Sequence, residues 1–224
     1  MRELRRLGAA LFVVIALGAV LAGSAFATAT TTAANWYTGT SGTLLTGSAT
    51  LSASASGATT IATMISGEPV EIQASSVSCV GCSISNSPAG AHGAGKLRFS
   101  GLTVVHPSPG CNVTDPIETA ALTFEADWME GTSALVRIVP TSGSTGTFFS
   151  FTLSGSCWNG TFPVKGSVFG KTTAATGTQT SNQTIQFTAA INSAAGGGLA
   201  AGGNAATLTG TDVLSTGGTP FGVH

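Results

Sequence analysis

Charged side chains are scarce in this chain. Only 8 % of its 224 residues are Asp, Glu, Lys or Arg, against roughly 25 % in an ordinary globular domain. Eight basic residues nearly balance nine acidic ones, so the basic excess typical of nucleic-acid binding is missing. Disorder is disfavoured too, because disordered chains combine high net charge with few apolar residues, whereas 42 % of this chain is hydrophobic. A single weakly charged domain fits this length and composition.

The motifs of common catalytic sites are also missing. The sequence contains no G-x-S-x-G, H-E-x-x-H or G-x-x-x-x-G-K-[ST] pattern. His92 and His106 fall in segments rich in Gly or Pro that are expected to be loops, and His224 is the last residue. A catalytic triad needs a buried histidine between a nucleophile and an acid. We therefore predict no catalytic residue, no cofactor and no enzymatic activity.

The N-terminal segment has the pattern of an export signal. Three arginines in residues 1–8 precede an apolar run over residues 9–23, and Ala25 and Ala27 supply the small side chains of an A-x-A cleavage site. We expect residues 1–27 to be a signal peptide whose helix is cleaved off after Ala27. The alternative is a retained anchor, for which the apolar stretch is barely long enough. The mature protein is then secreted, extracellular or bound at the cell surface, with no stable membrane insertion.

The four cysteines fit an exported protein with disulfides. Their number is even, and export brings them into an oxidising compartment. Of the three possible pairings, the spacing favours one. In it, Cys79–Cys82 would close a short loop at a turn, with Gly81 at the positive φ of a type II turn, and Cys111–Cys157 would close a long loop. A redox motif or half a zinc site is the alternative interpretation of C-x-x-C. Neither a following helix nor a second C-x-x-C supports it.

Period-two alternation predicts strands along the rest of the chain. In residues 119–127, for example, Leu122, Phe124 and Ala126 share one face of the strand. The segments with this pattern are 45–56, 69–78, 95–105, 119–127, 133–139, 146–155, 162–170, 183–191 and 205–214. We expect an all-β fold, an antiparallel β-sandwich or jelly roll, over residues 43–224, preceded by a flexible arm at 28–42.

Two glycine-containing segments interrupt the pattern. In residues 95–105 the apolar face shifts by one residue at Gly101, which indicates either a β-bulge or a simple change of face. Residues 192–206 are rich in Ala and Gly, and we expect them to form a flexible loop between two strands.

Acidic residues cluster between positions 115 and 130, namely Asp115, Glu118, Glu125, Asp127 and Glu130. Glu125 and Asp127 lie two residues apart, which puts their carboxylates on one face of a strand, about 6.5–7 Å apart along it. Such a pair suits a Ca²⁺ site or the two carboxylates of a glycosidase. Trp128 beside it suits either a sugar platform or, as we favour, a turn residue that folds back over the core. A solvated outer strand face is the more common interpretation, so Glu125 and Asp127 are weak calcium candidates and no metal site is predicted.

Taken together, these features resemble one class of exported bacterial protein. A signal ending Ala25-Phe26-Ala27, short Thr- and Gly-rich strands, the run at 95–104 and the pair Cys111 and Cys157 are similar to uncharacterised exported all-β proteins of high-GC bacteria. The layout also resembles that of secreted activators of alkane oxidation. The resemblance implies an exported β-protein and carries no functional residue.

Composition and resemblance together predict a non-enzymatic secreted or cell-surface protein with a structural, adhesive or self-assembling role. Its expected partners are further copies joined through exposed strand edges, or surface glycans. A carbohydrate- or calcium-binding module is the alternative, and a secreted hydrolase comes third.

Overall fold

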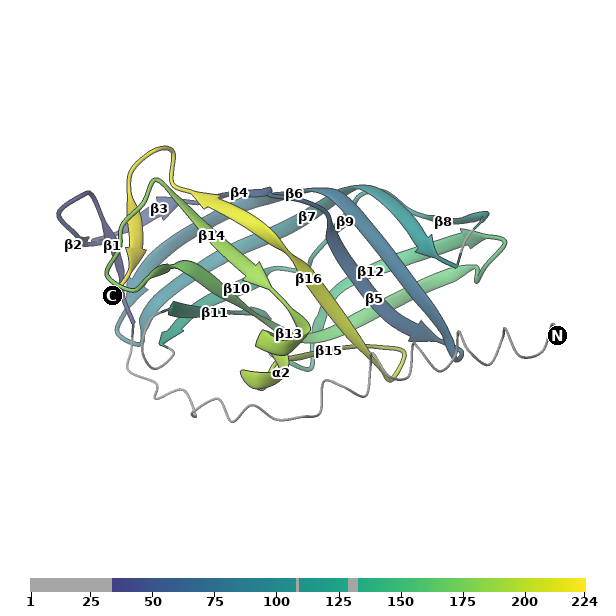
Figure 1. The fold of residues 1–224 in the computed structure, drawn as a ribbon. Helices are drawn as coiled ribbons and strands as arrows, with labels where there is room; N and C mark the ends of the chain where they lie inside the picture. The colour runs from purple at the N-terminus through teal and green to yellow at the C-terminus, as the bar shows by residue number, and fades with distance from the viewer. Residues whose placement is uncertain (1–33, 108, 129–132) are drawn as a thin grey trace.

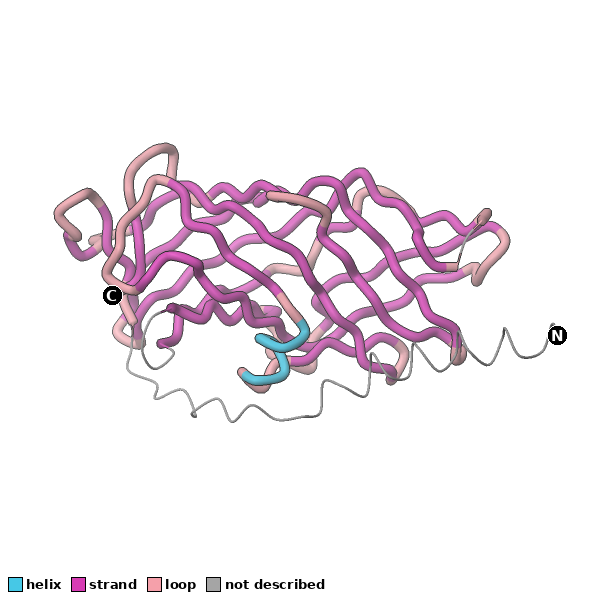
Figure 2. Tube along the Cα trace, in the orientation of Figure 1, coloured by secondary structure: helices cyan, strands magenta, loops and turns pink. Residues whose placement is uncertain are grey.

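The computed structural model describes residues 34–107, 109–128 and 133–224 (Figure 1). The expected signal peptide, its cleavage site at Ala25 and Ala27, and residues 28–33 of the expected arm lie outside the described residues. Within these residues, strands make up nearly all of the regular structure, and one short helix interrupts them (Figure 2). All pairings between described strands are antiparallel, so the predicted all-β, sandwich-like fold is confirmed.

The elements follow the chain in this order: β1 (Trp36–Thr38), β2 (Thr43–Leu44), β3 (Ser48–Thr50), β4 (Ser52–Ala55), β5 (Thr59–Ile65), β6 (Glu68–Ser87), β7 (Gly90–His106), β8 (Cys111–Val113), β9 (Ile117–Glu118), β10 (Leu122–Trp128), β11 (Ser133–Pro140), β12 (Thr147–Gly155), β13 (Gly160–Ala175), β14 (Asn182–Phe187), α2 (Ala189–Ala194), β15 (Gly198–Ala201), β16 (Asn204–Ser215) and β17 (Phe221–Val223).

The large sheet closes on itself. Its order is β11-β10-β7-β6-β4-β16-β14-β13-β12-β8, and β11 also pairs with β13. The long hairpin β6–β7 runs along most of the elongated sheet (Figure 1). A small sheet, β17-β1-β2, lies at one end. Because closure leaves most strands paired on both sides, open edges are confined to a few short stretches.

The core lies inside this closed sheet, as the alternation predicts. Leu122, Phe124 and Ala126 of β10 are all buried, with exposures of 0 %, 5 % and 5 %. The strand β12 contributes three fully buried phenylalanines, Phe148, Phe149 and Phe151. Phe149 of β12 packs against Phe99 of β7 with ring centroids 6.0 Å apart. Most inward positions are therefore apolar, while Ser and Thr occupy many outward ones. These hydroxyl side chains give the sheet a polar surface although the chain has few charged residues.

Residues 189–194 are a correction to the predicted strand at 183–191. They form α2, whose first turn is capped by Thr188: its side-chain oxygen accepts a hydrogen bond from the Ile191 amide at 3.1 Å. The expected flexible loop at 192–206 is likewise wrong in part. It contains β15, which pairs with both β13 and β16. The Asn192 side chain accepts a hydrogen bond from the Phe169 amide at 2.9 Å, which fixes α2 on β13.

At Gly101 the apolar face changes without a register shift between β6 and β7. Ser76 pairs with Ser100 and Ala74 with Leu102, so both strands advance equally across this point. Gly101 takes a positive φ of 63°, and the half-buried Leu102 then points toward the core. A change of face is therefore the correct alternative there.

The described part of the expected arm is paired rather than free. Trp36 of β1 is opposite Val223 of β17 and is 3 % exposed. Asn86 binds both backbone groups of Trp36, accepting from its amide at 2.7 Å and donating to its carbonyl at 2.9 Å. The two ends of the domain are thus joined at one end of the sheet.

Candidate functional site

The acidic residues expected to form a cluster are engaged separately in the structure. Glu118 pairs with Lys96 at 2.9 Å, and this hydrogen bond and charge lower the pKa of its carboxyl. Asp115 accepts hydrogen bonds from the amides of Gly101 and Leu102, at 3.0 and 3.2 Å. Each carboxylate therefore fixes a strand or loop locally, and Glu130 lies outside the described residues.

The calcium candidates Glu125 and Asp127 lie on β10, opposite Arg137 and Leu135 of β11. The Glu125 carboxylate is half-exposed and pairs with the Arg137 guanidinium at 3.3 Å. The side chains of Asp127 and Trp128 lie outside the described part of the structure. Within the described residues no group of three or more His, Cys, Asp and Glu side chains is placed to hold a metal ion.

His92 belongs to a strand, which corrects the loop expected around it. β7 begins at Gly90, and the carbonyl of His92 accepts a hydrogen bond from the Trp36 indole at 3.0 Å. His106 ends the same strand. The Tyr37 ring meets the His224 ring edge-on, with centroids 5.3 Å apart. The three histidines therefore lie at three different places in the fold: within β7, at its end, and beside Tyr37.

The four cysteines form the two pairs that the spacing favours. Cys79 and Cys82 have Cα atoms 5.5 Å apart, and we call this disulfide the 79–82 bridge. It spans a bulge inside β6, because Val80 is opposite Lys96 while Ser83 is opposite Ala94. Gly81 has the expected positive φ, 62°, although it lies in a bulge rather than a turn.

Gly95 faces the 79–82 bridge from β7. A Cβ atom on Gly95 would lie 2.6 Å from both the Cα and the Sγ atom of Cys82. Its φ of +151° also disfavours other residues. The close packing of the bridge against β7 thus requires glycine at this position.

The second disulfide lies at the far end of the sheet. Cys111 of β8 and Cys157, after β12, have Cα atoms 5.1 Å apart. This 111–157 bridge reinforces the pairing of Cys111 with Gly155. Disulfides persist in oxidising compartments, so two of them indicate that the protein works in one. No helix within the described residues has the length and hydrophobicity needed to cross a membrane.

A buried carboxyl that the sequence analysis missed lies inside the closed sheet. Asp212 of β16 is 5 % exposed, and its Oδ1 atom has no hydrogen-bond partner among the described residues. It lines a cavity of about 30 Å³ whose other walls are almost entirely apolar. Burial raises the pKa of Asp212 to about 6. The signal was present in the alternation of 206–214, in which Asp212 shares the inward face of β16 with Leu208 and Leu214.

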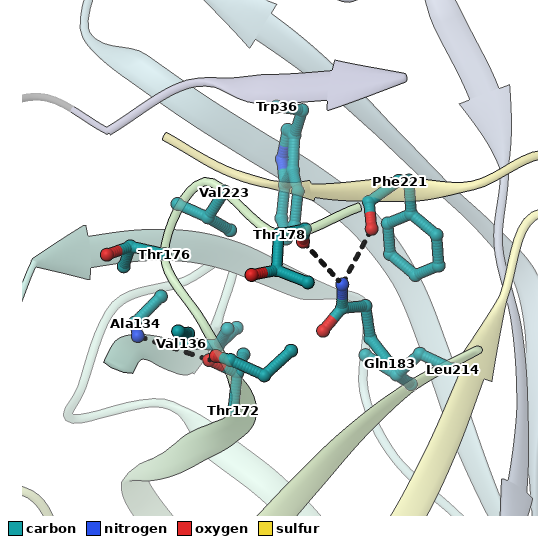
Figure 3. A pocket seen from close by; sticks show the side chains of 12 residues that line it. Trp36, Ala134, Val136, Thr172, Thr176, Thr178, Gln183, Leu214, Phe221 and Val223 are labelled. Atoms are coloured by element: carbon teal, nitrogen blue, oxygen red, sulfur yellow. Dashed lines mark hydrogen bonds between the residues drawn. The ribbon is translucent and has the colours of Figure 1, made fainter. Parts of the chain in front are cut away.

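A second, smaller pocket of about 10 Å³ adjoins this cavity (Figure 3). The two share Trp36, Val136 and Leu214 in their walls. The buried Gln183 amide donates to the Phe221 carbonyl at 2.6 Å and to the Thr178 carbonyl at 3.3 Å. Because Thr178 is exposed, this pocket lies between the surface and the cavity of Asp212.

Open strand edges lie at the two opposite ends of the molecule (Figure 1). At one end β2 pairs, among the strands that the structure describes, only with β1, and its Leu44 side chain is 45 % exposed. At the other end β8 pairs only with β12 among the described strands. Backbone groups on such edges are free to pair with another strand.

Comparisons with known proteins found no match. No family model matches the chain, and neither a curated protein nor a solved structure matches it.

Proposed function

We propose that this chain is a non-enzymatic structural protein of the extracellular space or cell surface, and that its copies associate end to end through strand edges. The open edges of β2 and β8 carry this proposal, because they lie at opposite ends of an elongated molecule (Figure 1). Addition of a strand from one copy to the sheet edge of another is a common mode of association.

The position of the two edges favours chains of copies over closed pairs. An interface between two different surfaces is heterologous, and it produces open filaments unless the rotation between copies closes a ring. Most long strands are paired on both sides, which directs association to the ends. The exposed Leu44 adds apolar area at the β2 end.

The two disulfides support the location. They suit a protein that works outside the reducing cytosol, and the N-terminal sequence has the pattern of an export signal. The 111–157 bridge also ties β8 to the loop after β12, so the β8 edge keeps one geometry in which it can receive a partner strand.

Sedimentation velocity over a wide range of protein concentration tests the proposal. We expect species that grow with concentration, together with filaments in electron micrographs. Leu44→Lys places a charge on the β2 edge and is expected to weaken association by at least about tenfold. A small proportion of this variant added to the unmodified protein is expected to shorten the filaments, because its β8 end still binds and its β2 end does not.

Val80→Lys is the matched control. Val80 is the other exposed large hydrophobic among the described residues, at 41 %, and it lies in the bulge of β6, away from both ends. The Val80→Lys substitution introduces the same charge as Leu44→Lys and is expected to leave association unchanged. A monomer at every concentration would overturn the proposal, as would equal effects of the two lysines.

A further inference from the structure

The cavity beside Asp212 has the features of a small binding site. Its walls come from β1, β4, β6, β7, β10, β11, β14 and β16, so strands far apart in sequence converge on it. At about 30 Å³ it exceeds the space that one water requires, about 10–15 Å³. The cavity therefore holds the polar end of a small ligand, and a short chain attached to it has to extend into the adjoining pocket of about 10 Å³.

The cavity has an apolar lining with a single ionisable side chain. Leu97, Phe124, Ile138 and Phe187 are among the apolar side chains that line it. Asp212 is the only ionisable side chain among its described lining residues, since Cys79 is held in the 79–82 bridge. An apolar cavity with one well-placed polar group is the usual construction of a small-molecule site.

The unpartnered oxygen of Asp212 specifies the polar end of the ligand. A carboxylate accepts hydrogen bonds and attracts positive charge. Because a buried carboxylate without a partner is costly, a cation that pairs with it is bound more tightly than a neutral group of the same size. A ligand that is itself a carboxylate would be repelled.

The smaller pocket provides the route inward. Figure 3 shows the Gln183 side chain below Trp36 and Phe221, with its amide hydrogen-bonded to the carbonyls of Thr178 and Phe221. Its shared wall residues place it directly beside the cavity of Asp212. A short alkyl chain lying along Leu214 would therefore extend from the cavity toward the surface.

We propose that this cavity binds a short primary alkylamine, with the ammonium group on Asp212 Oδ1 and the alkyl chain against Trp36 and Leu214. The ionisation of Asp212 at neutral pH supports this choice, since burial raises its pKa only to about 6. The site is independent of the end-to-end contacts, because Asp212 is buried in the middle of β16.

Isothermal titration at neutral pH with three matched probes tests the proposal: n-propylamine, n-propanol and propionate. We expect the amine to bind at least about tenfold more tightly than the alcohol, and propionate to bind more weakly than the alcohol. Asp212→Asn keeps the size of the side chain and removes its charge. It is expected to abolish the preference for the amine while circular dichroism shows an intact fold.

Glu125→Gln is the control, because Glu125 is a partly exposed carboxylate of the same chain, and it is expected to leave amine binding unchanged. Indole chemical shifts of Trp36 report binding inside the cavity. Three results would overturn the proposal: no amine binding, equal affinity for amine and alcohol, or an unchanged amine preference in Asp212→Asn.

Discussion

Asp212 makes the stability of the fold depend on pH in an unusual direction. Its pKa is about 6 in the folded protein, raised by burial from an ordinary value of 3.8. Between these two pH values the folded state retains a proton that the unfolded state has released. Raising the pH through this range therefore destabilises the fold, and the protection present below about pH 4 is lost above about pH 6.

The size of the effect follows from the two pKa values. Each pKa unit corresponds to about 1.4 kcal/mol, so the rise from 3.8 to about 6 corresponds to about 3 kcal/mol of unfolding free energy. Asp212→Asn removes the ionisation and keeps a neutral polar group of similar size. The variant is expected to match the unmodified protein near pH 4 and to exceed its stability by up to about 3 kcal/mol near pH 7.5.

Urea unfolding followed by the fluorescence of the buried Trp36 measures both proteins across this range. Taking the difference between the two proteins cancels the titration of all other groups. Glu125→Gln serves as the control, because an exposed ion pair contributes at most about 1 kcal/mol. A difference between Asp212→Asn and the unmodified protein that stays flat with pH, or that falls as pH rises, would refute the reasoning.

Three further predictions concern the packing of the sheet. Replacing Cys111 and Cys157 by alanine is expected to lower the unfolding free energy by about 4 kcal/mol, and replacing Cys79 and Cys82 by about 2 kcal/mol, because the 111–157 bridge closes the longer loop. Urea titration measures both losses, and equal losses would contradict the loop argument. Gly95→Ala meets Cys82 and is expected to cost about 1–3 kcal/mol more than Gly57→Ala, which has a similar φ but open space around it. Gln183→Leu removes the hydrogen bond to the Thr178 carbonyl and one of the two hydrogen bonds to the Phe221 carbonyl, which keeps that from the Thr180 amide. It is expected to cost about 1–3 kcal/mol of unfolding free energy, with faster hydrogen exchange in β17; unchanged exchange there would argue against it.

The strand pattern was predictable because it is local. Alternation assigns Leu122, Phe124 and Ala126 to one face, and burial confirms all three. The short helix α2 was not predictable, because six residues carry little helical periodicity. Its position also depends on a hydrogen bond between Asn192 and Phe169, which are far apart in sequence. Local sequence thus defines the sheet but not the element that lies against it.

In the candidate sites, too, residues could be picked out from the sequence, but their contacts depend on the fold. The acidic residues near Glu125 stood out in the sequence, yet pairing with distant partners such as Arg137 determines what they do. Asp212 was overlooked because one carboxyl in a Thr-rich strand is normally exposed. Its burial follows from the closure of the sheet, in which β16 pairs with β4 and β14, and that closure has no local signal.

Cross-linking between edge strands tests the proposed end-to-end association most directly. Thr43→Cys places a thiol on β2, and Asn112→Cys places one on β8, at opposite ends of the molecule. Mixing the two variants under mild oxidation is expected to give a covalent pair that contains one copy of each, while neither variant alone forms such a pair efficiently. Pairs formed equally well by each variant alone, or no pairs in the mixture, would contradict the account.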